Sequence, residues 1–361
     1  MKQINVGMIS YAHVHADFRS RALREIPEVK IVAISDNDDE RGKKAANTYG
    51  VNDFYLDYHD LLKRDDIDLV FIHSENDRHV DQVVAAAEAG KDIFCEKPMA
   101  TTIKGADKML SAVEKAGVKM AVGFCSRYML EAERTKKLVE EGIIGKVVLA
   151  RSIIGLAGVK EIGCPDYMVD WITDPVKGGG GAFIDEASHA TDLLRWLVGE
   201  VESVSAFMGN LVKKDLKVED NGICLLSFKN GALGELLSSW TLKLDIGMRN
   251  IVELYGTEGV LVAELTSPLP AVRVYVEKGI PSNLKGWSNP YIAPEAISPH
   301  FALSWPTHVI HYRREVQDVV TRYLSGEKFL ATGEDGRKSL EIIAAAYESA
   351  KTGRKINLPL H

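Results

Sequence analysis

Near its N-terminus the chain reads Ile4-Asn5-Val6-Gly7-Met8-Ile9-Ser10-Tyr11-Ala12-His13-Val14-His15, a short apolar run followed at once by a turn. The run has the length and apolar content of a buried strand, and a helical pattern begins at Ala16. A strand, a tight turn and a helix in direct succession are typical of the first unit of a doubly wound α/β domain. This stretch therefore predicts the fold class.

The same alternation of strand and helix continues to about residue 123. Further strands are predicted at Lys30–Ile34, Leu69–His73, Ile93–Cys95 and Lys119–Val122, and helices at Ala16–Glu25, Asp39–Tyr49, Tyr58–Arg64, Arg78–Ala89 and Thr102–Ala116. Gly50, Gly90 and Gly117 stand where helices should end. Because strands joined by helices run parallel, residues 1–123 are predicted to form a Rossmann-type domain, a parallel sheet with helices on both faces.

After a helix at Leu130–Glu141 the pattern changes to consecutive strands. These are predicted at Val147–Ile154, Val201–Met208, Gly222–Phe228, Ala232–Ser239, Arg249–Tyr255, Gly259–Glu264 and Ala271–Val276. Helices are expected at Phe183–Val198, Val309–Leu324 and Gly336–Lys351, and an ordered loop at Gly279–Pro306. Residues 124–361 are therefore predicted to form an α+β domain with a largely antiparallel open sheet.

The composition argues against a nucleic-acid-binding protein, a membrane protein and a disulfide-bonded protein. The chain has 361 residues, a net charge of −7 and no evident Lys/Arg cluster, so a nucleic-acid partner is not expected. No apolar run reaches the roughly 18 residues of a membrane span, and the N-terminus enters a strand at once. The four cysteines form no C-x-x-C pair, which favours buried thiols in a reducing compartment. We expect a cytoplasmic protein that binds no membrane.

The turn after the first strand is a degenerate dinucleotide fingerprint. The three glycine positions of the G-x-G-x-x-G pattern hold Ser10, Ala12 and His15, with His13 and Val14 between the last two. Ser and Ala are small enough for backbone amides to approach a pyrophosphate at a helix N-terminus, whereas the histidine is a bulky departure. The same residues also fit an ordinary strand–turn–helix connection.

A carboxylate at the end of the second strand strengthens the dinucleotide interpretation. Asp36 lies about twenty residues beyond the first turn, where an acidic side chain accepts hydrogen bonds from the ribose hydroxyls of an adenosine. The acidic residues that follow it, from Asp38 to Glu40, would repel a 2′-phosphate. NAD is therefore expected as the cofactor, and NADP is disfavoured. The alternative for Asp36 is a helix cap or turn residue.

Three further segments carry a family resemblance. They are Ser74-Glu75-Asn76-Asp77-Arg78-His79, Glu96-Lys97-Pro98, and the stretch from Gly178 to Asp192 that reads G-G-G-G-A-F-I-D-E-A-S-H-A-T-D. With these segments the whole chain resembles the glucose–fructose oxidoreductase / inositol dehydrogenase / rhizopine-catabolism (Gfo/Idh/MocA) family. Glu75 replaces a proline that is usual in the family's first segment.

The resemblance implies roles for individual residues. Lys97 would lie near the nicotinamide and the reacting hydroxyl, directed by Glu96, and Asp185 and His189 would complete the catalytic group. Ser74, Asn76, His79 and Arg127 would belong to the cofactor side. It also implies an NAD-dependent dehydrogenase acting on a sugar, cyclitol or sugar derivative, and homodimers or homotetramers formed through the second sheet.

Elementary chemistry agrees with these roles. Oxidation of a secondary alcohol by hydride transfer needs a base for the hydroxyl proton and a cation for the developing alkoxide. Asp185, His189 and Asp192 fall on one face of one helix, with His189 suited to take the proton and Asp192 suited to a structural role. Lys97 can supply the cation. Taken singly, Asp185 could cap its helix and His189 could be a core histidine.

Other interpretations stay open at this point. His13, His15, His73 and His79 suggest a metal site, but no carboxylate or thiolate completes a recognisable ligand spacing, so no metal is expected. Some relatives retain NAD and act in a redox-neutral way through a transient keto-sugar. A non-catalytic NAD- or sugar-sensing protein is a third possibility, although such a protein would not need both Lys97 and His189.

Overall fold

The computed structural model describes residues 3–243, 248–266, 271–276, 288–291 and 310–360. The chain forms two compact units. The first contains Met1–Phe124, Cys164–Gly179 and Tyr312–Leu340, and the second contains Cys125–Gly163, Gly180–His311 and Glu341–His361. The first unit thus includes two later segments that a single division after residue 123 leaves out.

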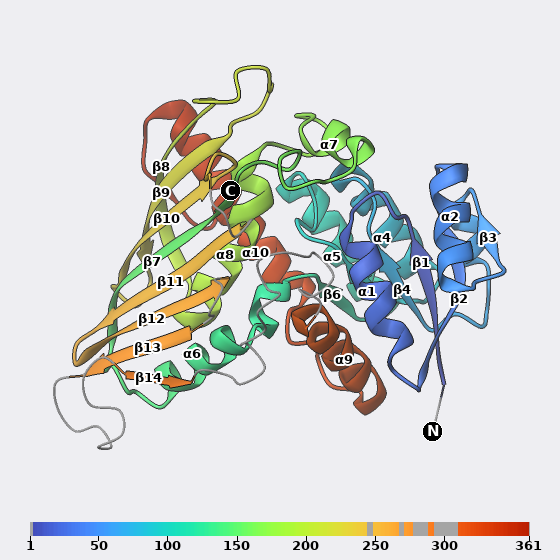
Figure 1. Ribbon diagram of the computed structural model, residues 1–361, viewed down its shortest axis with the longest axis horizontal. Coiled ribbons are helices and arrows are strands. Elements are labelled where there is room, and N and C mark those ends of the chain that lie inside the picture. The colour runs from blue at the N-terminus through green and yellow to red at the C-terminus, as the bar shows by residue number, and fades with distance from the viewer. Residues whose placement is uncertain (1–2, 244–247, 267–270, 277–287, 292–309, 361) are drawn as a thin grey trace. The chain divides into compact units, whose positions relative to one another are not determined.

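The first unit contains a six-stranded sheet in the described residues, and its strands run parallel, as the sequence predicted (Figure 1). Its strands are β1 (Ile4–Ile9), β2 (Val29–Ser35), β3 (Phe54–Tyr55), β4 (Leu69–Ile72), β5 (Asp92–Cys95) and β6 (Met120–Val122), and its helices include α1 (His15–Arg24), α2 (Asp39–Tyr49), α3 (Tyr58–Leu62), α4 (His79–Glu88) and α5 (Ile103–Ala116). The strand order is β3-β2-β1-β4-β5-β6. This order reverses between β1 and β4, and such a switch point is where doubly wound sheets bind ligands.

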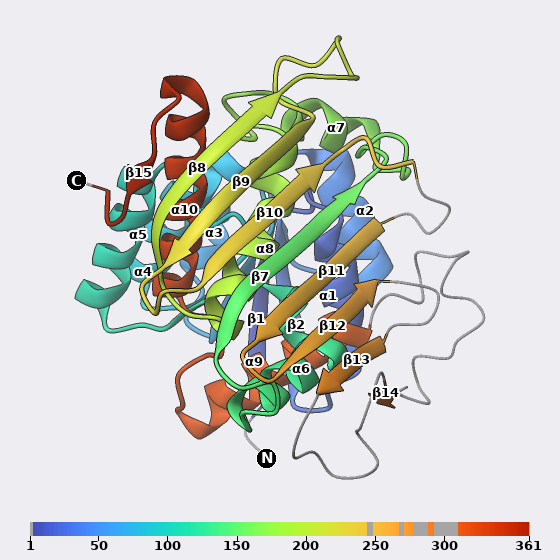
Figure 2. The same cartoon turned by 90° about the vertical axis from the view of Figure 1, so that its left-hand side faces the viewer.

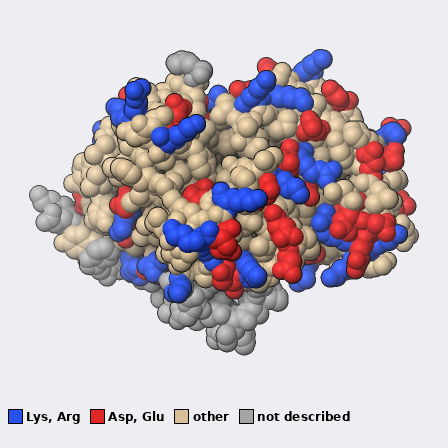
Figure 3. Space-filling model, turned by 90° about the horizontal axis from the view of Figure 1, so that it is seen from above, with Lys and Arg blue, Asp and Glu red and all other residues tan. Residues whose placement is uncertain are grey.

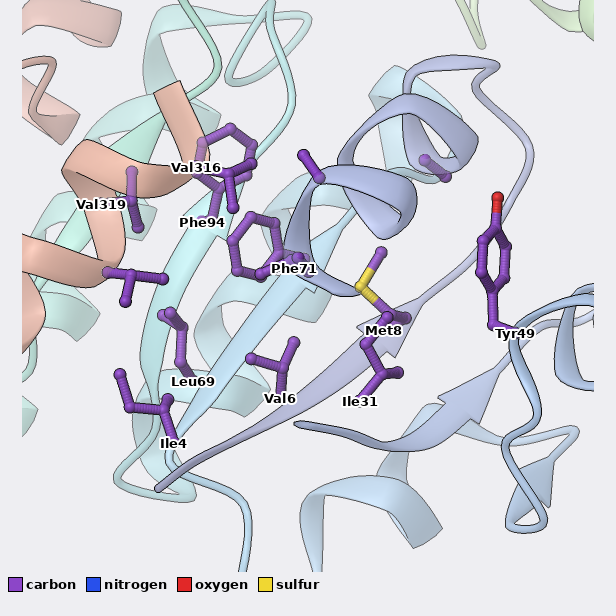
Figure 4. Packing of buried hydrophobic residues seen from close by; sticks show 14 of the residues in the cluster. Ile4, Val6, Met8, Ile31, Tyr49, Leu69, Phe71, Phe94, Val316 and Val319 are labelled. Atoms are coloured by element: carbon purple, nitrogen blue, oxygen red, sulfur yellow. The ribbon is translucent and has the colours of Figure 1, made fainter. Parts of the chain in front are cut away.

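A late helix completes the hydrophobic core of the first unit. Phe71 on β4 and Phe94 on β5 stack with ring centroids 4.6 Å apart, and Val316 from α9 (Ile310–Ser325) belongs to the same buried cluster (Figure 4). A short helix, α7 (Asp166–Ile172), also belongs to this unit. The sequence prediction contained neither α7 nor the two-residue strand β3, because both are too short to show a periodic pattern.

The second unit is built on a mixed, mostly antiparallel sheet, which confirms the predicted α+β class. Its described strands are β7 (Val147–Leu156), β8 (Val201–Gly209), β9 (Asn221–Phe228), β10 (Leu233–Ser239), β11 (Met248–Gly256), β12 (Gly259–Thr266), β13 (Ala271–Val276), β14 (Ser288–Tyr291) and β15 (Ile356–Asn357). Their order is β14-β13-β12-β11-β7-β10-β9-β8-β15, and only β7 and β10 pair in parallel among them. The predicted loop at 279–306 lies outside the described residues apart from β14.

Helices cover one face of this sheet. Helix α8 (Ala182–Leu197) packs on β7 and β10, and α6 (Leu130–Glu140) packs on β12. The opposite face, seen in Figure 2, carries exposed apolar side chains. Leu233, Leu149 and Tyr255 lie opposite one another on β10, β7 and β11, and each is at least one-third exposed.

The surface charges, the helices and the cysteines of the structure agree with what the composition predicted. Lys and Arg side chains are interspersed with Asp and Glu on the face shown in Figure 3. Within the described ranges, no helix combines the length and the apolar character that crossing a membrane requires. All four cysteines are free thiols.

Candidate active site

The turn after β1 has the geometry of a dinucleotide-binding turn without its glycines. Ser10 takes a φ of +69°, the left-handed conformation usually left to glycine, and its hydroxyl accepts the Ala12 amide at 3.1 Å. Helix α1 then begins at His15, and Val14 at its N-cap supplies no side-chain cap. A helix N-terminus at a switch point, without a capping carboxylate, suits an anionic group such as a pyrophosphate. These residues therefore fit a dinucleotide.

Asp36 stands at the end of β2, as predicted, but its carboxylate is fully engaged. It accepts hydrogen bonds from the Tyr11 amide (2.7 Å), the Asp38 amide (2.9 Å), and Arg41 Nε and a terminal Arg41 nitrogen (2.9 and 2.6 Å). Arg41 is a residue that the sequence prediction missed. It lies in a charged stretch at the start of a helix, which is typical of a solvated surface.

His15 and Glu96 form a hydrogen-bonded pair beside this turn. His15 Nδ1 lies 3.2 Å from Glu96 Oε2, and Arg19 pairs with the same carboxylate oxygen. Although burial alone would raise it, the charge of Arg19 holds the pKa of the Glu96 carboxyl well below its usual range. Because an ionised carboxylate only accepts hydrogen bonds, the facing His15 Nδ1 must carry a proton. Burial lowers the pKa of His15, so the ring is neutral near pH 7 and its Nε2 has no proton.

His13 takes the opposite tautomer. The His15 amide donates to His13 Nδ1 at 3.1 Å, so that nitrogen is unprotonated, while burial lowers the pKa of His13 well below its usual value. A neutral His13 therefore carries its proton on Nε2, as a donor. The ring centroids of His13 and His15 are 4.1 Å apart. The turn thus presents an imidazole donor and an imidazole acceptor side by side.

Among the described residues, His13, His15 and Glu96 form a cluster of side chains that could hold a metal ion. Ligand atoms of His13, His15 and Glu96 all lie within 4.8 Å of one another. Glu96 supplies the carboxylate that sequence spacing alone did not reveal, because it follows a different strand. Its oxygen is already bound by Arg19 and His15, and His13 Nδ1 is bound by an amide. Hydrogen bonding and charge pairing therefore explain the cluster without a metal.

Arg19 connects the cluster to a distant helix. It lies on α1, is fully buried, and its Nε donates to Glu315 of α9 at 2.9 Å. Burial raises the pKa of Glu315 to about 7, with Arg19 opposing the shift. Because Arg19 and Glu315 are 296 positions apart, no local sequence signal could have paired them.

Most of the residues expected on the cofactor side after β4 hold the backbone. His79 Nδ1 and Nε2 lie 3.0 and 3.2 Å from the carbonyl oxygens of Pro98 and Ser74. Asn76 donates to the Gly178 carbonyl at 2.9 Å, and the Ser74 hydroxyl donates to Gln82 at 2.6 Å. Each is buried. These bonds fix the segments that follow β4 and β5.

Lys97 follows β5 and is only 4% exposed. Its amide donates to Glu96 Oε1 at 2.9 Å, so the Glu96 carboxylate joins the lysine backbone to His15. The Lys97 charge contributes to lowering the pKa of both His13 and His15, which places it in the same polar cluster. A lysine this buried is suited to stabilising a negative charge, because the cost of burying its ammonium group is offset only where negative charge is present or develops.

The second unit holds the other predicted catalytic residues on α8. Asp185 and His189 are each 6% exposed, one turn apart on this helix. Asp192 is fully buried and forms a bidentate ion pair with Arg127, at 2.7 and 2.5 Å. The pair ties α8 to the segment Cys125–Tyr128. The ion pair therefore helps to hold α8 within this unit.

A side-chain carboxylate caps the glycine-rich N-terminus of α8. Glu219 Oε1 accepts the amides of Gly181 and Phe183, both at 2.9 Å, and the Tyr347 hydroxyl at 2.7 Å. A Cβ on Gly180 would lie 2.1 Å from the Tyr347 hydroxyl oxygen, and one on Gly181 would lie 2.0 Å from the Glu219 carbonyl oxygen. These glycines therefore make room for Glu219 and Tyr347. Asp185 is not the N-cap, since that position is Gly181.

Comparison with known proteins decides the family. Residues 4–124 match the model described as "Oxidoreductase family, NAD-binding Rossmann fold", and residues 132–262 match the "GFO/IDH/MocA C-terminal domain". The chain belongs to the GFO/IDH/MocA oxidoreductase family. It is thus an oxidoreductase of an NAD-binding family, with NAD as its cofactor.

Similar proteins span nearly the whole chain. An uncharacterized oxidoreductase, YrbE of Bacillus subtilis, is 28% identical, with 99% of this chain and 97% of that protein covered. The myo-inositol 2-dehydrogenase of Thermotoga maritima is 27% identical, with 98% and 97% covered. A levoglucosan dehydrogenase solved with NADH and L-sorbose is 25% identical over 100% of both chains, with a TM-score of 0.88.

Proposed function

We propose that this protein is an NAD-dependent dehydrogenase that oxidises a secondary hydroxyl of a sugar, a cyclitol or a sugar derivative. The observation that carries the proposal is Lys97, a lysine only 4% exposed just after strand β5 of the parallel sheet, in a chain of an NAD-binding family. The similar proteins named above include dehydrogenases of myo-inositol and levoglucosan, which support a polyhydroxylated substrate.

The protein's own groups divide the work of the reaction. Bound NAD supplies the acceptor for the hydride of the C–H bond. His189 takes the hydroxyl proton, and Asp185, one turn before it, orients the acid–base group. The Lys97 ammonium stabilises the developing alkoxide, and Glu96 holds the lysine backbone in place. His13 and Val14 in the turn after β1 receive the pyrophosphate, and Asp36 receives the adenosine ribose in exchange for its hydrogen bonds to Arg41.

The open face of the second sheet supports a homodimer or homotetramer. Leu149, Leu225, Leu233 and Tyr255 project from it, and Phe207 is 77% exposed. Flanking charges are paired on the same face, with Arg151 3.5 Å from Glu235 and 3.7 Å from Glu253. An apolar patch rimmed by paired charges is typical of a protein–protein interface.

The proposal assigns the protein to the cytoplasm, where NAD is available and four free thiols remain reduced. Nucleic acid and membranes have no role in it. The dehydrogenases among its relatives favour net oxidation over a redox-neutral reaction, and a non-catalytic sensor would have no use for a buried Lys97.

A substrate panel tests the proposal. The protein is mixed with NAD and, one at a time, with sugars, anhydrosugars and inositols, and the absorbance of reduced nicotinamide is followed. At least one polyol should produce reduced coenzyme with saturation in both substrates. Complete absence of turnover across the panel, with NAD bound, would favour the sensor instead.

A further inference from the structure

Arg19 lies between two buried carboxylates of the first unit. One of its terminal nitrogens donates to Glu96 and its Nε donates to Glu315 at 2.9 Å, and none of the three side chains is more than 1% exposed. One buried guanidinium can neutralise only one carboxylate fully. Either one of the two carboxyls therefore keeps a proton, or the group holds an uncompensated negative charge.

The hydrogen bonds show which of the two carboxyls is ionised. Glu96 accepts from Arg19, from the Lys97 amide at 2.9 Å and from His15 Nδ1 at 3.2 Å. Because all three are donors, they favour the ionised form of Glu96. Burial raises the pKa of Glu315 to about 7, and the charge of Arg19 opposes this increase. Glu315 thus holds the proton, and the charge of Arg19 is left to Glu96.

Arg19 is also the cation that sets the charge of Glu96. The other titratable groups that face this carboxylate are His13, His15, His73, His79, Cys95 and Glu315. Burial lowers the pKa of the four histidines and raises that of the thiol, so these five groups are neutral near pH 7. Burial alone would raise the pKa of Glu96, and the charge of Arg19 is the largest effect that opposes it.

Two aromatic rings hold the Arg19 guanidinium between the carboxylates. Its central carbon lies 4.6 Å from the centre of the Phe94 ring and 5.1 Å from the centre of the Tyr312 ring. Phe94 is on β5, just before Glu96, and Tyr312 is on α9, the helix of Glu315. A flat cation with donors in fixed directions can serve both carboxylates at once, whereas an ammonium on a flexible stem is a single point charge.

We propose that Arg19 is a positioning residue for the reaction: by keeping Glu96 ionised, it holds the Lys97 backbone so that the ammonium meets the developing alkoxide. Protonation of Glu96 would turn an acceptor oxygen into a donor and release the Lys97 amide or His15. This inference rests on the catalytic role of Lys97 in the proposed function and adds a residue of α1 to it.

The test compares the pH dependence of kcat, with the best polyol of the substrate panel, in wild type, Arg19→Met, Arg19→Lys and Arg24→Met. The dissociation constant for NAD is measured beside it. Methionine keeps the apolar stem of arginine and removes its charge. Arg24→Met is the matched control, because it removes a guanidinium from the exposed last turn of the same helix.

Arg19→Met should lower kcat near pH 7 by about 10–10²-fold, because Glu96 then takes up a proton and Lys97 is misplaced. Higher pH ionises Glu96 again, so the acid limb of the kcat profile should move to higher pH, with most of the loss recovered by about pH 9. Arg19→Lys restores the charge and should recover part of kcat. The NAD dissociation constant should change less than kcat in both, and Arg24→Met should match wild type.

An infrared titration follows the same charges without turnover, since the carbonyl stretch of a protonated carboxyl is separate from that of a carboxylate. Wild type should show a buried protonated carboxyl that is lost with a midpoint near pH 7, and Glu315→Gln should lack it. Arg19→Met should show a second protonated carboxyl at neutral pH, from Glu96.

Two results overturn the inference: a loss of kcat in Arg19→Met that is equal at every pH, or a wild-type kcat profile without the second protonated carboxyl. Should Arg19→Met fail to fold, the double variant with Glu315→Gln, which removes one of the two unpaired carboxylates, must show the same shift. Failure of the proposed function looks different, because wild type then turns over no polyol while the infrared titration still reports the charge of Glu96.

Discussion

The N-termini of α1 and α8 are capped in different ways. The turn before α1 has small residues at Ser10 and Ala12, and the turn before α8 consists of glycines. At α1 a neutral side chain, His13, accepts the His15 amide, whereas at α8 the Glu219 carboxylate accepts the amides of Gly181 and Phe183. The α1 N-terminus therefore has no capping carboxylate, and the glycines before α8 make room for the protein's own carboxylate.

In this account α1 belongs to the coenzyme site and α8 carries the catalytic His189. Variants of Lys97 and His189 should therefore lose turnover and keep coenzyme binding, and this is the largest expected effect. Lys97→Ala and His189→Ala should each lower kcat by about 10²–10⁴, because they remove the charge that stabilises the alkoxide and the base. Both should bind NAD like wild type, since neither side chain lies in the turn after β1. Turnover is measured beside the dissociation constant for NAD. Turnover within threefold of wild type in both variants would refute the catalytic assignment.

Removing the Glu219 cap of α8 should lower the free energy of unfolding. Glu219→Ala leaves two buried amides and the Tyr347 hydroxyl without their acceptor, at about 1–3 kcal/mol of unfolding free energy. Tyr347→Phe removes one hydrogen bond and should cost about 1 kcal/mol. Urea unfolding measures both, and NAD affinity should be unchanged. Equal stability of Glu219→Ala and wild type would show that the cap contributes nothing.

Much of the first unit could be predicted from sequence, for local reasons. Apolar runs of strand length located five of its strands, and Asp36 followed from its spacing after the first turn. Arg41 was missed because a charged helix start gives no sign of which carboxylate it meets. Glu219 and Glu315 were missed because their partners lie at least 36 residues away in the chain. Such pairs depend on tertiary packing, which a periodic pattern does not encode.

A carboxylate placed at the N-terminus of α1, like that of Glu219 at α8, should weaken coenzyme binding. Val14→Asp places a carboxylate at the N-terminus of α1, where it competes with the pyrophosphate. We expect about a tenfold loss of NAD affinity, or about 1.4 kcal/mol, without loss of stability. Val14→Asn, which can cap without charge, is the control and should lose less. Unchanged affinity in Val14→Asp would place the phosphates elsewhere.

The smallest expected effect concerns Glu315, which reaches the coenzyme side through Arg19. Burial raises its pKa to about 7, above its value of about 4.3 in an unfolded chain, so the folded state binds this proton more tightly. Its contribution to stability is therefore full below about pH 4.3 and is lost as pH rises toward 7. Glu315→Gln should flatten this pH dependence of the unfolding free energy between about pH 4.3 and 7. Urea unfolding at several pH values checks this, and parallel profiles for the two proteins would contradict it.

Transfer of deuterium tests the central claim most directly. The protein is incubated with NAD and with sugars or inositols that carry deuterium on their ring carbons, and the coenzyme is analysed by mass spectrometry. The account predicts deuterium in the reduced nicotinamide and one equivalent of ketone, with both abolished in Lys97→Ala. Deuterium that returns to the sugar without net ketone would indicate a redox-neutral enzyme. Bound NAD that gains no deuterium from any polyol would contradict the account.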